Sequence, residues 1–260
     1  MLVAPVLQAA SSVLILTLAA SCGRNMLQTR HHFMQKDDSY FSSMFDNDAT
    51  MTDLISSSRN SPLPPELVVQ NLRSMKREKL LHIFSKSLSP SNLTEIQGEW
   101  DGCLLENNGV IMTLVSKIMT NGLFGFGRKW NGKEFMLDSK GTNRFIVRGI
   151  SNDGSGSLHS SIATAHGFDY SITDSVVDNK QEATTSSSVV RLKYSNYHRT
   201  LSLWSTMADE VRFIPAGDKQ VLIGFGCMEW SGGMLNGAPF CLWRANPEAN
   251  KNRMHQDTEI

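Results

Sequence analysis

The chain has 260 residues, 40% of them hydrophobic, and its 25 Lys and Arg side chains balance 25 Asp and Glu side chains. A formal net charge of zero argues against the long-range positive field with which nucleic-acid-binding proteins attract their partners. The composition favours a small or apolar partner, and the length suits one or two domains with a real core.

Residues 1–21, MLVAPVLQAASSVLILTLAAS, form an apolar run that has no charged side chain and ends in small residues. Such a run is typical of a secretory signal peptide. Interspersed polar residues make it a poor membrane span, so we expect no stable span after its removal. Because basic residues precede the first acidic residue, Asp37, the region also resembles a transit sequence. We expect a secretory or extracellular location, with a plastid or a mitochondrion as the alternative.

Residues 22–64 are rich in Ser, Asn, Asp and Met, show no periodicity and end in prolines. This composition predicts a disordered linker. Pro64-Pro65-Glu66 then suits the first turn of a helix, and apolar residues recur at helical spacing through 65–88. We expect one amphipathic helix there, packed on the following domain by its apolar face. Residues 247–260 are expected to form a flexible polar tail.

Between residues 92 and 246 the sequence changes to short β-like runs separated by turn residues. Val190, Leu192 and Tyr194 alternate with basic residues, and this period of two is typical of half-buried strands. We expect further strands at 97–106, 123–130, 133–138, 143–149, 158–165, 168–173, 200–206, 211–213, 219–230 and 238–244. That many short strands favour a barrel or a sandwich. The predicted fold class is mainly β: an antiparallel lipocalin-like barrel with an N-terminal helix and a short helix between the first two strands.

That short helix is predicted at 109–120, where apolar residues follow the spacing i, i+3, i+4, i+7 and Asn121-Gly122 supplies a stop. Because its apolar stripe must be buried, we expect the helix to act as a lid or plug across one barrel opening.

A Trp-x-Gly motif occurs three times, at Trp100-Asp-Gly102, Trp130-Asn-Gly132 and Trp230-Ser-Gly232. An aromatic residue followed by residues that tolerate positive φ predicts the end of a strand and a hairpin turn. Paired glycines within other runs (Gly125, Gly127, Gly224 and Gly226) permit the sharp coiling or bulges that small barrels need, or make room for bulky neighbours or a ligand. Their spacing fits neither a dinucleotide-binding loop nor a phosphate-binding loop.

Three motifs together resemble the GxWxG-domain family and the uncharacterised domain that usually follows it: Gly98-Glu-Trp100-Asp-Gly102, Trp130-Asn-Gly132-Lys133-Glu-Phe135 and Pro239-Phe240-Cys-Leu242-Trp-Arg244. The Gly-x-Trp near the first strand and a basic residue on the last also resemble the lipocalin or calycin arrangement. That resemblance implies that Trp100 is buried at one barrel end under an arginine, either Arg244 or Arg212. Gly98, Trp100, Gly102 and Arg244 then have structural roles.

Catalytic and metal-binding signatures are absent from the sequence. The seven histidines are scattered, and no HExxH, CxxC or GxSxG occurs, so we expect no metal site and no cofactor. His198 and Asp209 are the best available titratable groups for an enzyme. Asp209 and Arg212 could also form a polar pair at a barrel mouth.

The leading hypothesis for function is a lipocalin-like module that binds a small lipophilic ligand such as a lipid, a fatty acid or a pigment. The candidate ligand-binding residues are Phe124, Phe126, Trp130, Trp204, Arg212 and Trp243, although the aromatic residues could equally be plain core. One alternative is an isomerase or epoxide-type enzyme acting on a lipophilic substrate in the same barrel. The other is a ligandless scaffold or interaction domain, which a filled interior would favour.

Cleavage near Cys22 would leave three cysteines. If 219–230 and 238–244 form a hairpin centred on Met234, Cys227 lies opposite Cys241 and Phe225 lies opposite Trp243. An oxidising compartment could then close a Cys227–Cys241 disulfide, with two unreacted buried thiols as the alternative.

Overall fold

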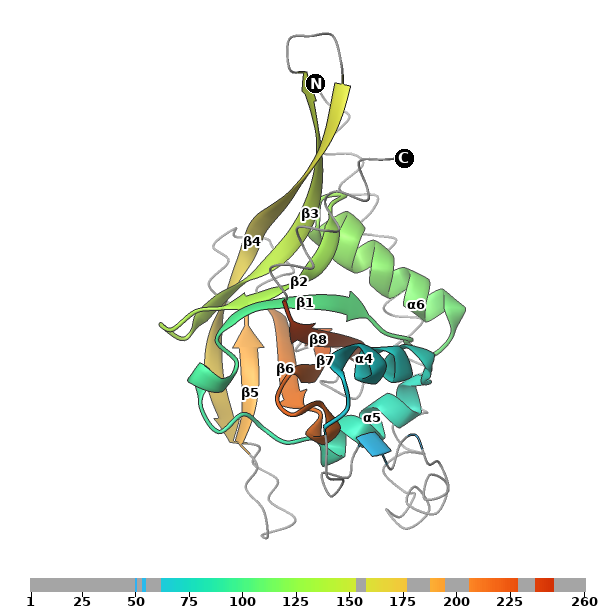
Figure 1. Ribbon diagram of the computed structural model, residues 1–260, viewed down its shortest axis with the longest axis vertical. Coiled ribbons are helices and arrows are strands. Elements are labelled where there is room, and N and C mark those ends of the chain that lie inside the picture. The colour runs from blue at the N-terminus through green and yellow to red at the C-terminus, as the bar shows by residue number, and fades with distance from the viewer. Residues whose placement is uncertain are drawn as a thin grey trace. The chain divides into compact units, whose positions relative to one another are not determined.

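The computed structural model describes residues 50, 53–54, 62–152, 158–176, 188–194, 206–228 and 237–245. Eight antiparallel strands form a closed barrel, in which each strand pairs with its sequence neighbours and β8 pairs with β1 (Figure 1). The predicted fold class is therefore confirmed. The strands are β1 (Gly98–Leu104), β2 (Lys129–Phe135), β3 (Lys140–Asn152), β4 (Leu158–Val176), β5 (Ser188–Lys193), β6 (Met207–Phe213), β7 (Val221–Met228) and β8 (Ala238–Arg244).

The predicted targeting segment 1–21 and the predicted tail 247–260 lie outside the described residues, as does most of the predicted linker 22–64. Two of the described linker residues contact the rest of the fold: Leu54 is fully buried, and the Leu63 N–H donates to the Ala216 carbonyl at 2.8 Å. Ala216 belongs to the short 3₁₀ turn η4 (Pro215–Gly217) between β6 and β7.

Two helices, α4 (Pro65–Ser74) and α5 (Arg77–Lys86), replace the single helix predicted at 65–88. Pro65 begins α4, as its position in the sequence predicted. The helix breaks because the backbone is extended at Met75 and Lys76. This break lets both apolar faces turn inward, so that Val68, Val69 and Leu72 of α4 and Leu80, Ile83 and Phe84 of α5 are buried. α4 contacts β7, β8 and η4.

The helix predicted at 109–120 is present as α6 (Val110–Lys117), and it continues into a wider π-helical stretch, η2 (Ile118–Phe124). The strand predicted at 123–130 is therefore wrong, and β2 begins only at Lys129. Asn121, predicted to end the helix, accepts a hydrogen bond from the Trp130 N–H at 2.8 Å and so ties the helical segment to the strand.

The β3–β4 hairpin is longer than the sequence indicated and extends beyond the neighbouring strands (Figure 1). The strands predicted at 158–165 and 168–173 are one strand, β4. Gly167 lies within it and pairs with Asn143, next to a register shift in β3, so the glycine accommodates an irregularity without ending the strand. Of the strand predicted at 200–206, only the last residue lies within the described part of the chain.

The first two Trp-x-Gly motifs lie in the middle of β1 and β2, so the prediction that they mark strand ends is wrong. Asp101 pairs with Gly132, beside a β-bulge between Trp130 and Gly132. Gly132 has a φ of 139°, and a Cβ atom there would lie 2.0 Å from the Trp100 carbonyl oxygen. A Cβ atom at Gly102 would lie 2.8 Å from the Trp130 ring. The glycines therefore allow close packing between two adjacent strands. The third motif, at 230–232, lies outside the described residues.

Trp100 closes the barrel end at which β1 begins, and the predicted arginine partner is Arg244. The Trp100 side chain is fully buried, and the Arg244 guanidinium carbon lies 4.3 Å from the centre of its ring. The indole Nε1–H donates to the Ile96 carbonyl at 2.6 Å. The predicted stacking is therefore confirmed, and such a cation–π contact contributes roughly 0.5–2 kcal/mol. Gly98, two residues before Trp100, has a φ of 104°, which only glycine adopts readily.

The register predicted for the last hairpin is wrong. Cys241 pairs with Ile223 and Trp243 pairs with Val221, so the hairpin is centred on residue 232 rather than on Met234. Cys227 therefore does not face Cys241, and this pairing rules out the predicted disulfide; neither cysteine forms a disulfide in the structure. The predicted and observed partners of Cys241 differ by four residues, an even number, so the faces of the side chains were still predicted correctly. The residue opposite Cys241 on its other side is Cys103 of β1.

We predict that Gly132→Ala lowers the free energy of unfolding by about 2–6 kcal/mol, because the new methyl group meets the Trp100 carbonyl at a strained φ. Urea unfolding monitored by tryptophan fluorescence measures this loss. Gly127→Ala is the matched control, since Gly127 also has a positive φ, of 80°, but no atom within 4 Å of an added Cβ. We expect the control to cost only about 1–2 kcal/mol. Equal losses in the two variants would contradict the close approach of β1 and β2.

Candidate functional site

The barrel interior is lined by large side chains that alternate along the strands. Eight aromatic residues take part, and all are at most 7% exposed: Trp100, Trp130, Phe135, Phe145, Tyr170, Tyr194, Phe213 and Phe240. Aliphatic residues on β4, β5, β6, β7 and β8 complete this cluster. Within the described residues, these inner side chains therefore fill much of the space that eight strands enclose.

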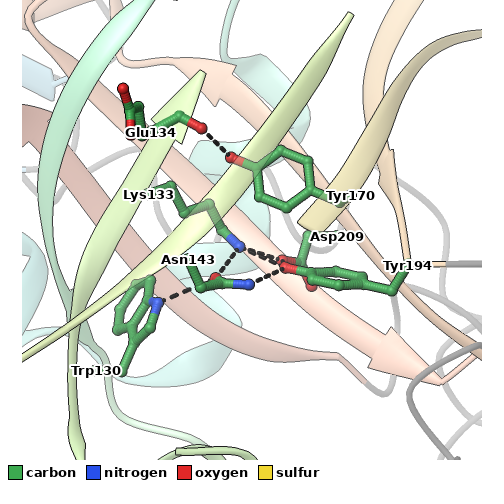
Figure 2. A network of polar contacts seen from close by, with 7 residues as sticks. All are labelled: Trp130, Lys133, Glu134, Asn143, Tyr170, Tyr194 and Asp209. Carbon is green, nitrogen blue, oxygen red and sulfur yellow. Dashed lines mark hydrogen bonds and ion pairs between the residues drawn. The ribbon is translucent and has the colours of Figure 1, made fainter. Parts of the chain in front are cut away.

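A lysine ammonium and a carboxylate meet inside this aromatic cluster (Figure 2). Lys133 of β2 is 2% exposed, and its Nζ lies 2.7 Å from Oδ2 of Asp209 on β6. The same Nζ donates to Asn143 Oδ1 at 2.8 Å and to the Tyr194 hydroxyl at 2.6 Å. Tyr194 in turn donates to Asp209 Oδ2 at 2.7 Å. Trp130 Nε1–H donates to Asn143 Oδ1 at 3.2 Å, so an indole joins the network.

Aromatic rings surround the ammonium group of Lys133. Its Nζ lies 5.0 Å from the ring centre of Tyr170, 5.3 Å from Tyr194, 5.5 Å from Phe240 and 5.9 Å from Trp130. Rings at such distances stabilise a cation through their quadrupoles, especially away from water. The site is therefore an aromatic cage that is already occupied by a cation of the chain itself.

Two glycines of β7 make room for this arrangement. A Cβ atom at Gly226 would lie 2.7 Å from Asp209 Oδ1, and one at Gly224 would lie 2.3 Å from the Phe240 ring. Both glycines pair with β6 residues across the ladder. The sequence analysis proposed that these glycines permit coiling or accommodate bulky neighbours, and the structure assigns them the second role.

Burial controls the ionisation of the cluster. It lowers the pKa of Lys133 below its ordinary value of 10.5, and the charge and hydrogen bond of Asp209 oppose this decrease. Burial likewise raises the pKa of Tyr194 well above 10, and the Asp209 charge adds to the rise. An ammonium group has three N–H donors. The acceptors of the three Lys133 donors are Asn143, Tyr194 and Asp209. The geometry is therefore that of a satisfied buried network, with no ammonium proton left for a substrate.

The predicted ligand-binding residues do not share one pocket. Trp130 points into the barrel, but Phe126 lies in the turn before β2 and is 65% exposed. Trp243 is on the outer face of β8, where the Arg73 guanidinium carbon lies 5.7 Å from its ring. The side chain of Phe124 and the whole of Trp204 lie outside the described residues, as does His198.

The expected pair of Asp209 and Arg212 is also wrong, because an odd spacing of three residues in a strand sends the two side chains to opposite faces. Asp209 points into the barrel, whereas the Arg212 guanidinium carbon lies 4.7 Å from the ring of Phe84 on α5. The sequence analysis missed Lys133 as a partner of Asp209, although Lys133 stands within the Trp130–Phe135 motif. The available signal was a lysine at a position where the alternation of the strand predicts an inward-facing side chain.

α6 does not bury its apolar stripe, so the expectation that this stripe is covered is wrong. Val110, Ile111, Leu114 and Ile118 are all exposed, and Ile111 keeps 77% of its surface accessible. The polar side chains of the helix bond to the loop that precedes it. Asn107 Nδ2–H donates to the hydroxyl of the buried Ser116 at 2.7 Å, and the Asn107 N–H donates to the Thr113 hydroxyl at 2.9 Å. The helix therefore leaves aliphatic side chains exposed, unlike an amphipathic helix that packs its apolar face on a core.

The described part of the chain shows neither a metal-binding cluster nor a membrane-spanning helix. His, Cys, Asp and Glu side chains do not gather there in groups of three or more that could hold a metal ion. Among the helices in the same residues, none combines the length and the apolar character needed to cross a membrane.

Comparisons with known proteins assign this chain to no family. No family model matches the chain, so its resemblance to the GxWxG-domain family stays a prediction. No curated protein matches it either. Among solved structures, a protein from Thermomonospora curvata is similar with a TM-score of 0.43 and 14% identity, over 70% of this chain and 95% of its own length. A likeness this distant says nothing about activity.

We predict that Lys133→Met lowers the free energy of unfolding by about 3–5 kcal/mol at neutral pH, because it leaves the Asp209 carboxylate buried without a counter-charge. Chemical unfolding measures the loss. The double variant Lys133→Met/Asp209→Asn removes both charges and is expected to regain at least half of it. A loss below about 1 kcal/mol for the single variant would show that the carboxylate reaches water, which contradicts the buried network.

Proposed function

We propose that this chain is a non-catalytic β-barrel module that binds lipid through the exposed apolar face of α6. The observation that carries the proposal is the exposure of aliphatic side chains on this helix. Val110, Ile111 and Leu114 are 86%, 77% and 55% exposed. Exposed aliphatic side chains gathered on one helix face mark a contact surface rather than chance exposure.

The charge around α6 suits an anionic lipid surface. The sequence has no acidic residue between Glu106 and Glu134, while Lys117 and Lys129 are exposed. Arg128 is partly buried, and its guanidinium carbon lies 4.9 Å from the Phe145 ring. An apolar helix face flanked by basic side chains is the usual pattern of a helix that lies in the membrane interface. Each basic side chain near such a surface contributes about 1 kcal/mol.

The barrel interior supports a non-catalytic reading. An enzyme in the barrel would need a titratable group that faces a substrate with a donor or acceptor free. Lys133 and Asp209 instead satisfy each other within a closed network, together with Tyr194 and Asn143. The role proposed for the interior is to hold the barrel together.

A second candidate is a small lipophilic ligand held inside the barrel, as in the lipocalin-like arrangement that the motifs resemble. The closed eight-stranded antiparallel barrel and its aromatic lining favour it, because barrels of this size hold one small ligand when side chains leave room. Membership in the GxWxG-domain family, and a secretory or organellar location, remain part of this proposal.

Vesicle co-sedimentation of the full chain tests the α6 surface. We expect Ile111→Ser/Leu114→Ser to weaken binding to vesicles of mixed phosphatidylcholine and phosphatidylserine by at least tenfold, because two aliphatic side chains leave the acyl region. Both residues are exposed, so stability should change by less than about 1 kcal/mol. Leu137→Ser is the matched control, since Leu137 is 70% exposed but lies in the β2–β3 turn.

Equal binding by the wild type, the α6 variant and the Leu137 control would contradict the α6 surface. Titration with a fluorescent fatty acid separates the second candidate. Saturable one-to-one binding that survives Ile111→Ser/Leu114→Ser favours an internal ligand, whereas loss of both signals in that variant favours the helix face.

A further inference from the structure

Two cysteines lie side by side on the outer face of the barrel. Cys103 of β1 is the direct cross-strand partner of Cys241 of β8, and their Sγ atoms are 3.4 Å apart. Directly opposed residues in an antiparallel pair have Cα atoms about 4.5–5.5 Å apart. This separation falls within the range that a disulfide spans, so the bond requires little movement of the backbone.

An arginine from α4 contacts the pair. The Arg73 Nε–H donates to Cys103 Sγ at 3.2 Å, and its guanidinium carbon lies 5.7 Å from the ring of Trp243 on β8. The Trp243 contact helps to hold the guanidinium beside the sulfur. A cation in this position stabilises a thiolate over a thiol, and the thiolate is the form that reacts.

The two sulfurs differ in ionisation. The hydrogen bond from Cys241 lowers the pKa of Cys103 to about 6, with the hydrogen bond and charge of Arg73 contributing and burial opposing. The pKa of Cys241 is raised well above 9, because it donates to Cys103 and is buried. The directions of the two shifts make Cys103 the more acidic thiol of the pair and Cys241 the proton donor. Arg73 and Cys241 are the titratable groups that face Cys103.

The two cysteines also differ in solvent accessibility, and again Cys103 is the one that favours reaction. Cys103 is partly exposed, whereas Cys241 has no accessible surface. A small oxidant therefore reaches Cys103 first. Cys241 is buried next to Cys103 and supplies the second thiol. Low pKa, partial exposure and a neighbouring resolving cysteine are the features of redox-sensitive cysteines.

We propose that Cys103 and Cys241 form a redox-active dithiol that hydroperoxides convert into a disulfide. The Cys103 thiolate attacks one oxygen of the peroxide, the O–O bond breaks, and Cys103 becomes a sulfenic acid while the alkoxide or hydroxide that leaves takes up a proton. Cys241 then loses its proton and attacks Cys103. An S–S bond forms, the S–O bond breaks, and hydroxide leaves as water. Two thiols and one hydroperoxide thus give a disulfide, an alcohol or water, and one water.

Peptide mapping of the full chain after treatment with a small excess of hydrogen peroxide tests the proposal. We expect a peptide linked through Cys103 and Cys241 that disappears on reduction. The Cys241→Ser variant keeps a hydrogen-bond donor but lacks the second thiol, so Cys103 should accumulate as a sulfenic acid that dimedone traps. Cys227→Ser is the matched control and should form the linked peptide at the wild-type rate.

The pH dependence of iodoacetamide labelling gives a second readout. Labelling of Cys103 should rise with a midpoint near pH 6, because the thiolate forms as pH increases through its pKa. Arg73→Ala should move that midpoint upward. The proposal is overturned if folded wild-type protein gives no linked peptide, or if Cys103 is labelled at pH 7 no faster than the buried Cys227.

Discussion

A lysine ammonium enclosed by the barrel is the constraint on which the rest of the fold depends. Lys133 is almost fully buried, and Asp209, Asn143 and Tyr194 converge on its Nζ from other parts of the barrel. A buried ion pair adds little net stability compared with apolar packing, but the loss of one partner is costly. The pair therefore acts mainly on specificity: a one-residue slip of β2 or β6 would turn one charge outward and leave the other alone in the core.

The side chains inside the barrel and those on its outside pack in different ways. Inside, Gly224 and Gly226 provide space for Phe240 and Asp209, so small residues on one strand are matched by large ones on its neighbours. Outside, α4 packs against β7 and β8 and places Arg73 beside the Cys103–Cys241 pair, and Phe84 of α5 packs against Phe225 of β7. α6 is the exception, because its aliphatic residues Val110, Ile111 and Leu114 stay exposed.

The sequence was sufficient for features that depend on local pattern. Alternation of Val190, Leu192 and Tyr194 predicted inward-facing strands, and the Gly-x-Trp signature with a late arginine predicted the stacking of Trp100 under Arg244. Features that depend on long-range geometry were missed. The Cys241 partner follows from loop length and barrel closure, which places β1 beside β8, and no local pattern encodes that pairing. The periodicity of α6 was read correctly as a helix, but periodicity does not say which face is covered.

The central claim is that lipid contacts the outside of the barrel at α6 while the Lys133 cluster stays closed. Intermolecular nuclear Overhauser effects between lipid acyl chains and assigned amide and methyl groups of the full chain, in lipid nanodiscs, test it most directly. The account predicts contacts to Ile111, Leu114 and Ile118, with unchanged shifts for Tyr194 and Asn143. Acyl-chain contacts to Tyr194, Phe240 or Trp130 would contradict it, because they would place the lipid among the residues that enclose the lysine.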